Sequence, residues 1–309
     1  MTAHARPIPL PHLSSERYLL WEGNGTDLIF NRGVDMPGFA SFPLLANPDT
    51  RAVLAQQLTE FLRLAQDLGR PCIVGTHTWQ ANPARAGRLG YSRAALDDIN
   101  REAALFLRET VAASGNNRVL CSGLVGPRDD PYADAIPMGV EEARVYHTPQ
   151  IAQFQGAGLD FIGAFTLNKP KEAAGLAVAA REAGLPVVLS LVVETDGRLA
   201  NGQTLDDAIA EIDRLSDTAP AYFMVNCAHP SHIAPGLTGN PRLRGLIVNA
   251  SRCSHAELDE ATELDAGDPA ELGREMAALL ADNPHVRVFG GCCGTDLRHI
   301  NQMSEAVGR

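Results

Sequence analysis

The sequence predicts a single (β/α)8 barrel of the α/β class, and three observations lead to this prediction. Short apolar strands and amphipathic helices alternate about eight times along the chain. Each predicted strand is an unbroken apolar run, which is typical of parallel strands buried on both faces. The rival fold is an open doubly wound sheet, and it is disfavoured because no G-x-G-x-x-G follows the first strand.

Composition agrees with one large α/β domain. The chain has 309 residues, of which 45% are hydrophobic and 20% charged, enough to bury the core of one barrel. We therefore expect residues 1–309 to form one domain, with residues 1–16 as an irregular lead-in. The net charge of -11 disfavours nucleic acid and membrane surfaces as partners, because both would repel the chain. No apolar run approaches the roughly 20 residues that span a bilayer, and no signal core is seen, so we expect a cytoplasmic protein.

Local signals define the elements of the first half of the chain. The first strand begins at Tyr18 and ends at Glu22 in a glycine turn, and a short helical piece follows through Phe30. Asn47 and Pro48 form a cap and first-turn pair for a helix that runs to about Leu68. The other elements expected here are a loop over 37–48, a strand over 72–79, a helix over 92–115 and a strand over 118–125.

The second half opens with the one long irregular segment, residues 126–138, which contains Tyr132. A loop of this length after a strand favours a lid or binding loop, with a solvated excursion as the alternative. Beyond it we expect helices over 140–155, 171–183, 205–215, 268–281 and 297–306, and strands over 161–166, 186–193, 222–227, 246–249 and 286–290.

In a barrel the C-terminal ends of all strands meet at one mouth, so polar residues that are distant in sequence become neighbours. We therefore expect the functional site at this mouth. The candidate residues at the predicted strand ends are Glu22, Thr76, His77, Thr166, Glu194, Cys227, Asn249, Cys292 and Cys293.

Cysteines at two of these strand ends favour a metal site. Cys292 and Cys293 lie within Gly-Gly-Cys-Cys-Gly-Thr, and Cys227 ends another apolar run. Three thiolates from two strand ends can hold zinc and leave its fourth position open, as in catalytic sites. His229 is the competing ligand, but it would point the same way as Cys227 only if the strand continued past Pro230. The remaining cysteines, Cys72, Cys121 and Cys253, are expected to be structural.

The thiolate-rich ligand set indicates the chemistry. Such a zinc ion activates water poorly but suits the binding of a substrate thiol and the removal of its proton. A free thiol with a pKa of ~8.5 is mostly protonated at neutral pH, whereas a metal-bound thiolate remains a nucleophile. The implied reaction is alkyl transfer to sulfur. A barrel hydrolase that uses zinc-bound water is disfavoured, because no histidine cluster is evident.

Five segments, in order along the chain, resemble the homocysteine S-methyltransferase family, which includes betaine-homocysteine methyltransferases and the homocysteine-binding part of cobalamin-dependent methionine synthases. These segments are Trp21–Asp27, Thr76–Ala81, Val225–Pro230, Asn249–Ser251 and Gly290–Thr295. The resemblance implies a (β/α)8 barrel in which Cys227, Cys292 and Cys293 bind zinc and homocysteine supplies the fourth ligand. It implies that methionine is the product, and that no catalytic side chain acts beyond the zinc-activated substrate thiol.

Departures from the family pattern bear on the acceptor. The family usually has Asp-Gly-Gly at the first strand, where Glu22-Gly-Asn keeps a carboxylate to meet the substrate ammonium. A Glu-Thr pair usually follows the fourth strand, whereas the segment from Ala164 to Pro170 has no acid. Glu194 could supply this charge, with a solvated strand-end glutamate as the alternative. The missing acid also motivates a second interpretation, zinc-dependent methyl transfer to a different thiol or selenol.

The length of the chain limits the classes of methyl donor that can be expected. No length remains for cobalamin or folate modules, so we expect a diffusing donor such as S-methylmethionine, S-adenosylmethionine or a betaine. Trp79 could lie over a cationic donor, with ordinary packing as the alternative. A non-catalytic zinc-binding protein is the remaining interpretation. The residues expected to bind substrate are Glu22, Thr76, His77, Trp79, Thr166, Glu194, Asn226 and Asn249.

Overall fold

The computed structural model describes residues 8–132 and 136–308. Eight parallel strands form a closed barrel in chain order, and β8 pairs with β1 to close it. The predicted (β/α)8 barrel is confirmed. The strands are β1 (Tyr18–Trp21), β2 (Cys72–Gly75), β3 (Val119–Val125), β4 (Phe161–Leu167), β5 (Val187–Leu191), β6 (Tyr222–Ala228), β7 (Leu243–Val248) and β8 (Val288–Gly291).

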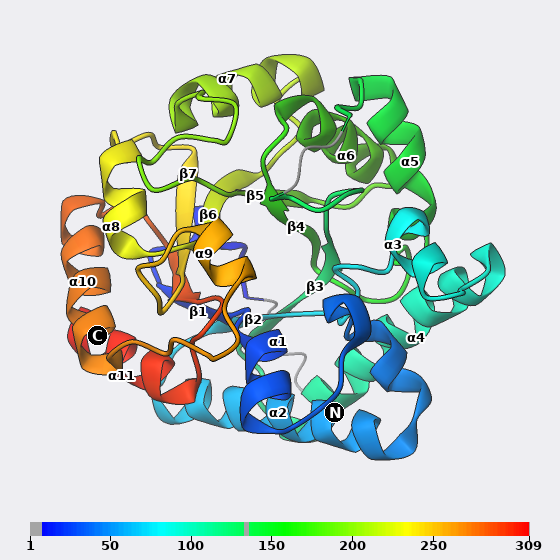
Figure 1. The fold of residues 1–309 in the computed structure, drawn as a ribbon, viewed down its shortest axis with the longest axis horizontal. Coiled ribbons are helices and arrows are strands. Elements are labelled where there is room, and N and C mark those ends of the chain that lie inside the picture. Colours follow the sequence, from blue (N-terminus) through cyan, green and yellow to red (C-terminus); the bar gives the residue numbers. More distant parts are fainter. Residues whose placement is uncertain (1–7, 133–135, 309) are drawn as a thin grey trace, which may run out of the picture.

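Long helices surround the ring of strands, as Figure 1 shows in a view close to the barrel axis. They are α2 (Pro48–Asp67), α4 (Arg93–Ser114), α5 (Val140–Ala152), α6 (Pro170–Glu182), α7 (Leu205–Ser216), α10 (Pro269–Asp282) and α11 (Leu297–Val307). Short helices follow four of the strands, namely α1 (Asn24–Thr26), α3 (Pro83–Arg88), α8 (Pro230–Ile233) and α9 (His255–Asp259). Brief 3-10 or π-helical turns occur at Pro11–Leu13, Asp27–Asn31, Pro37–Phe39, Phe42–Ala46 and Ala234–Gly236.

The capping residues found in the sequence fix the helix ends. The Asn47 side chain accepts a hydrogen bond from the Asp49 amide at the start of α2, and Ser92 does the same for Ala95 at the start of α4. Such caps satisfy backbone N–H groups that have no partner within the helix. Gly115 ends α4 in a left-handed conformation with φ 70°.

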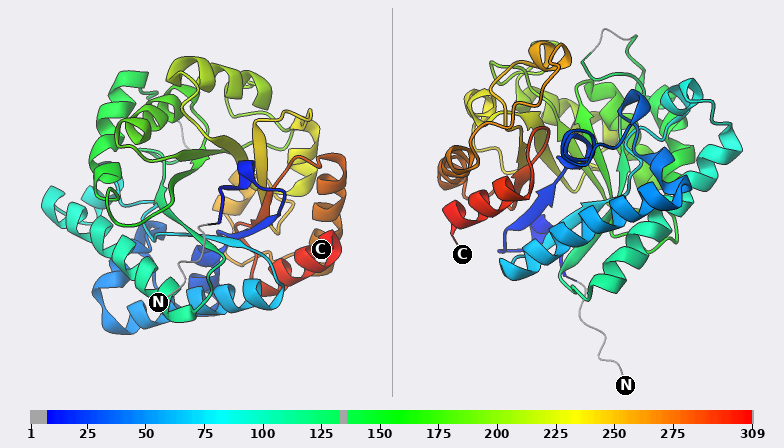
Figure 2. Two further views of the ribbon diagram at one scale, coloured as in Figure 1. Left: turned by 180° about the vertical axis from the view of Figure 1, so that it is seen from behind. Right: turned by 60° about the horizontal axis from the view of Figure 1, so that its bottom comes forward.

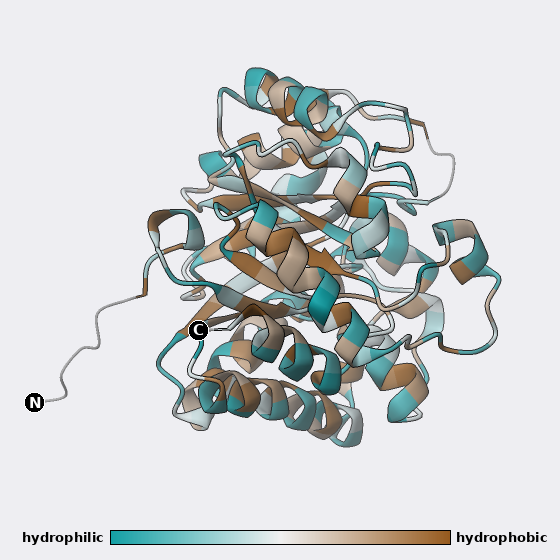
Figure 3. Ribbon diagram, turned by 90° about the vertical axis from the view of Figure 1, so that its left-hand side faces the viewer, coloured by the Kyte–Doolittle hydropathy of each residue, from teal (hydrophilic) through white to brown (hydrophobic). Residues whose placement is uncertain are grey.

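Strand side chains alternate between the barrel interior and the layer under the helices. Leu20, Phe161 and Phe165 belong to the interior cluster, while Leu19 belongs to the larger cluster between strands and helices. Figure 3 shows the resulting apolar strands beneath helices whose outer faces are polar. The described interior side chains thus form a packed core rather than a pore.

The lead-in closes the end of the barrel opposite the mouth. The Tyr18 hydroxyl donates to the Pro9 carbonyl at 2.7 Å, and the His12 ring lies 5.5 Å from that of Tyr222. In the right-hand view of Figure 2, the first described residues lie below the strands. The predicted irregular lead-in of residues 1–16 thus contains a 3-10 turn, and its residues 1–7 lie outside the described residues.

Some element boundaries differ from the prediction. β2 ends at Gly75 rather than at Trp79, because side chains replace the backbone pairing: the Thr76 and Thr78 hydroxyls lie 2.6 Å apart, and the Thr78 hydroxyl donates to the Leu124 carbonyl. β7 begins at Leu243, earlier than expected, since Arg244 interrupts its apolar run. Within the described residues, no helix is both long and apolar enough to cross a membrane.

Candidate metal centre and substrate cavity

Cys227, Cys292 and Cys293 lie together at the C-terminal mouth of the barrel. Their sulfur atoms are all within 4.8 Å of one another, and no other group of three potential metal ligands occurs among the described residues. Cys227 belongs to β6, and the adjacent pair follows β8. Cys227 and Cys292 are joined as a disulfide with their Cα atoms 5.4 Å apart, whereas Cys293 is a free thiol.

The backbone at Cys227 takes an unusual conformation that two neighbouring side chains support. Its φ is 56°, in the left-handed region that costs a non-glycine residue roughly 1 kcal/mol or more. Its carbonyl accepts hydrogen bonds from Asn249 Nδ2 at 3.0 Å and from His255 Nε2 at 2.7 Å. These two donors come from the connection after β7, so this connection helps to fix the Cys227 sulfur.

A second left-handed residue, Thr166 with φ 62°, stands at the end of β4. The Asn226 side chain holds it through both of its polar atoms: Oδ1 accepts from the Thr166 amide at 3.0 Å, and Nδ2 donates to the Thr166 hydroxyl at 2.9 Å. Strand pairing is irregular at both places. The residue that precedes Cys227 therefore ties the end of β4 to the end of β6.

The Cys292-Cys293 pair lies in a turn that is equally well held. The Cys292 carbonyl accepts from the Thr295 hydroxyl at 2.6 Å, and the Cys293 carbonyl accepts from the Ala250 amide at 3.0 Å. Gly294 has φ 79°, which favours glycine, and its amide donates to the Thr26 hydroxyl. Both sulfur atoms are thus presented by a backbone that hydrogen bonds hold in place.

The donor set fits a thiolate-bound metal once the disulfide is reduced. Burial raises the pKa of the Cys293 thiol to about 11, so without a nearby cation it stays protonated at neutral pH. A metal ion stabilises the thiolate, and three cysteine sulfurs from two strand ends match the ligands that zinc prefers in proteins.

The competing ligand His229 lies away from this cluster. Its Nε2 is 3.2 Å from a Glu275 carboxylate oxygen and its Nδ1 is 2.9 Å from the Ser231 hydroxyl. Burial lowers the pKa of His229 to about 4, so the ring is neutral at pH 7. Of the cysteines expected to be structural, Cys72 and Cys121 are buried within β2 and β3, and Cys253 is exposed.

A cavity of about 640 Å³ opens beside the three cysteines. It is lined by every residue expected to bind substrate except one, namely by Glu22, Thr76, His77, Trp79, Thr166, Asn226 and Asn249. The exception is Glu194, whose amide bonds to the Arg198 carbonyl in a turn after β5. The Glu194 side chain is 40% exposed, with a carboxylate oxygen 3.5 Å from His255 Nδ1.

Glu22 and His77, two of the ionisable groups that line the cavity, have strongly shifted pKa values. Burial raises the pKa of Glu22 to about 8, and no salt bridge to this carboxyl occurs within the described part of the chain. Burial also lowers the pKa of His77 to about 4, so its ring is neutral at physiological pH. Asn249 adds an acceptor, since its buried Oδ1 has no hydrogen-bond partner among the described residues. The cavity thus suits the cationic group of a ligand near Glu22.

The rim of the cavity includes two residues that were not singled out in the sequence, His255 and Arg85. The rings of Tyr132 and His255 lie 4.3 Å apart, and Arg85 lies over the ring of Trp79. The binding loop predicted over 126–138 thus contributes Tyr132 to the cavity, while residues 133–135 lie outside the described residues. Ser254 and Glu257 form a capping box at the start of α9. The sequence therefore contains a signal that predicts the helix carrying His255.

Comparison with known proteins agrees with this geometry. A family model described as "Homocysteine S-methyltransferase" matches residues 21–307. The oxidized form of the homocysteine methyltransferase MmuM from Escherichia coli is 20% identical, with 96% of this chain and 97% of that chain covered and a TM-score of 0.74. Its metallated form is 19% identical, with coverage of 94% and 96% and a TM-score of 0.68. At these identities the solved structures establish the shared fold. The family match, which spans nearly the whole chain, shows that this protein belongs to the homocysteine S-methyltransferase family and is a methyltransferase.

Proposed function

We propose that this enzyme transfers a methyl group from a small sulfonium or betaine donor to homocysteine at a zinc ion held by Cys227, Cys292 and Cys293, forming methionine. Family membership supports methyl transfer to homocysteine. The observation that carries the metal is the meeting of three cysteine sulfurs within 4.8 Å at the barrel mouth. Bound zinc would lower the pKa of the homocysteine thiol, so that its sulfur is a nucleophile at neutral pH.

The residues around the cavity bind and orient the two substrates. The Glu22 carboxylate and the unpartnered Asn249 Oδ1 would accept hydrogen bonds from the homocysteine ammonium. Held in this way, the substrate sulfur attacks the donor methyl carbon; one carbon–sulfur bond forms while the methyl-to-donor bond breaks, and its electron pair leaves with the donor. The chain contributes positioning, because reactants held in line gain a large effective concentration.

The active form requires the reduced cysteines. A sulfur in the Cys227–Cys292 disulfide is no thiolate and cannot serve as such a ligand. The E. coli relative is described in both an oxidized and a metallated form, which supports two states for these cysteines. We also propose that residues 1–309 act as one domain in the cytoplasm, and that the product serves methionine biosynthesis.

A cysteine variant tests the metal and the reaction together. The reduced protein should contain about one zinc per chain by mass spectrometry of metals, and it should form methionine from homocysteine with one of S-methylmethionine, S-adenosylmethionine or a betaine. Cys292→Ala should lose both zinc and turnover. The matched control is Cys253→Ala, which removes an exposed cysteine outside the cluster and should keep both. Retention of zinc and methyl transfer by Cys292→Ala would refute the mechanism.

The second interpretation, a different thiol or selenol acceptor, is favoured by one observation. Phe165 at the end of β4 lines the cavity, so this strand end presents an apolar wall where the family usually carries an acid. An acceptor panel separates the two interpretations. Faster turnover of a thiol that lacks an amino group would favour the second, and preference for homocysteine would favour the first.

A further inference from the structure

Helix α3 places a buried arginine in the wall of the cavity. Arg85 is 9% exposed and lines the cavity. Its position is fixed by Asn82, whose Oδ1 accepts from the Arg85 amide at 3.1 Å and from the Tyr146 hydroxyl at 2.9 Å. Asn82 Nδ2 also donates to the Pro127 carbonyl at 3.0 Å, which ties α3 to the connection after β3. Arg85 therefore stands on a rigid support.

The guanidinium of Arg85 lies over the ring of Trp79, with 4.8 Å between its central carbon and the ring centroid. Trp79 is itself held, since its Nε1 donates to the Phe165 carbonyl at 3.1 Å and Gly126 leaves no room for a side chain against it. Stacking uses the face of a guanidinium and leaves its N–H groups, which lie in the plane, available as donors. The contact with Trp79 thus helps to hold the guanidinium in place without using its N–H donors.

Within the described residues, the charge of Arg85 is not matched by an ion pair. One N–H group donates to the Asp129 backbone carbonyl, and the carboxylates of Asp130 and Asp129 act on Arg85 electrostatically without forming a salt bridge to it. Burial lowers the pKa of Arg85, but an arginine keeps its charge at any physiological pH. A buried cation without a counter-ion is costly, and the most direct source of the missing charge is an anionic group on a ligand in the cavity.

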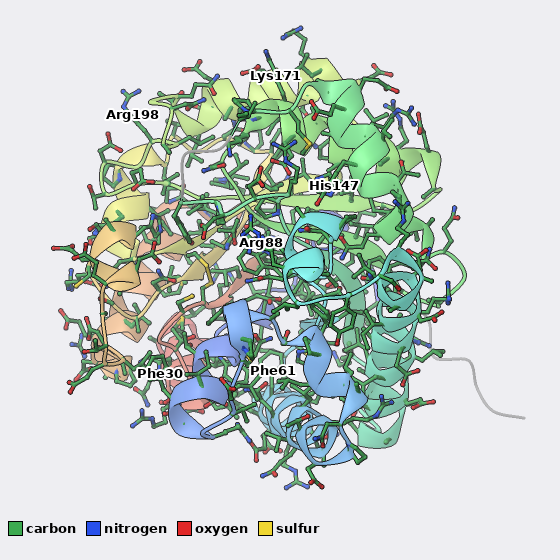
Figure 4. The ribbon with its side chains drawn as sticks, turned by 45° about the vertical axis from the view of Figure 1, so that its right-hand side comes forward. Phe30, Phe61, Arg88, His147, Lys171 and Arg198 are labelled. Carbon is green, nitrogen blue, oxygen red and sulfur yellow. A yellow bond between two sulfur atoms is a disulfide. The ribbon has the colours of Figure 1, made fainter. Side chains whose placement is uncertain are left out.

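We propose that Arg85 binds the carboxylate of a zwitterionic substrate in this cavity through paired hydrogen bonds. Planar carboxylates match the geometry of a guanidinium, whereas the cationic methyl-bearing group of a sulfonium or betaine is repelled by it. Such a donor would therefore turn its carboxylate toward α3 and its methyl group away from it. Arg88, labelled on α3 in Figure 4, also lines the cavity and adds positive potential at the same wall.

This inference rests on the proposed function, because that function supplies the two substrates considered as ligands of Arg85. Both the methyl donor and homocysteine carry a carboxylate that Arg85 could bind, and the experiment below shows which of the two it binds. Four probes are suited to this: S-methylmethionine, homocysteine and the carboxamide of each, which keeps the shape but removes the negative charge.

The test compares Arg85→Met, Arg85→Lys and wild type by calorimetric binding of the four probes to the reduced, zinc-loaded protein. Arg85→Met should weaken one of the two acids about ten- to hundredfold, the scale of a paired charged hydrogen bond, and leave its carboxamide almost unchanged. Arg85→Lys should recover part of the loss. The matched control is Arg93→Met in the exposed first turn of α4, which should bind all probes like wild type.

Each outcome decides the proposal. A selective loss for S-methylmethionine assigns Arg85 to the donor, and a selective loss for homocysteine assigns it to the acceptor. Equal losses for an acid and its carboxamide, no loss for either acid, or no binding of any probe to wild type would overturn the assignment. Thermal melts show whether Arg85→Met is folded, and Arg85→Lys provides a second reading if it is not. Absence of turnover with every donor would refute the proposed function, whereas the measured binding affinities would still test the role of Arg85.

Discussion

Replacing Asn226, the residue that precedes Cys227, by alanine should lower the stability of the fold and weaken metal binding. The change removes both hydrogen bonds to Thr166. Loss of the bond to the Thr166 hydroxyl costs about 1 kcal/mol, and loss of the acceptor for the buried Thr166 amide costs about 1–3 kcal/mol. We expect the free energy of unfolding to fall by about 2–4 kcal/mol. Because Thr166 and Cys227 both have positive φ, their backbones should relax, and zinc affinity should fall as well.

Urea unfolding of the reduced, metal-free protein measures the first effect, and competition with a coloured zinc chelator measures the second. The control is Asn116→Ala, which removes two hydrogen bonds near the opposite end of the barrel, from Asn116 Nδ2 to the Leu62 carbonyl and from the Arg118 amide. This variant should lose comparable stability and keep its zinc affinity. Unfolding of Asn226→Ala at the same urea concentration as wild type, or an equal loss of zinc affinity in the two variants, would refute this role of Asn226.

Two further predictions concern charge and packing. The folded pKa of Glu22, about 8, lies above the usual value of 4.5, so its contribution to folding is complete below pH 4.5 and is lost as the pH rises to about 8. Chemical unfolding of the metal-free protein should show this decline, and Glu22→Gln should remove it; identical pH profiles would contradict the burial of this carboxyl. Gly290→Ala should destabilise the barrel by more than about 3 kcal/mol, because its new methyl group would overlap the Leu20 carbonyl. Gly87→Ala, in the open part of α3, should be neutral or stabilising, and similar melting temperatures for the two alanine variants would disprove the close approach of β1 and β8.

Much of the fold and the cysteine cluster could be predicted because their signals are local. Apolar runs give the strands, capping residues such as Asn47 and Ser92 give the helix starts, and a closed barrel brings Cys227 beside Cys292 without further information. The same rule explains why most of the expected substrate residues line one cavity.

What could not be predicted depends on contacts between distant segments. Glu194 directly follows the strand predicted over 186–193, but β5 ends at Leu191, and a turn to Arg198 places Glu194 outside the cavity lining. His255 reaches the Cys227 carbonyl from α9, and Arg85 becomes a cavity residue only because its helix packs over Trp79. No sequence pattern around His255 or Arg85 predicts which distant atom its side chain contacts.

The chain order of the ligands has a consequence for biosynthesis. Cys227 and Cys292 are 65 residues apart, and the segment that carries the second and third sulfurs follows the strand that seals the ring against β1. A nascent polypeptide that still lacks β8 and this segment has one of the three sulfur ligands and no strand to close the barrel against β1. It can therefore neither complete the barrel nor bind a metal ion at all three sulfurs. Metal binding should therefore be among the last steps of folding, and a metal-bound site would show that the whole barrel has formed.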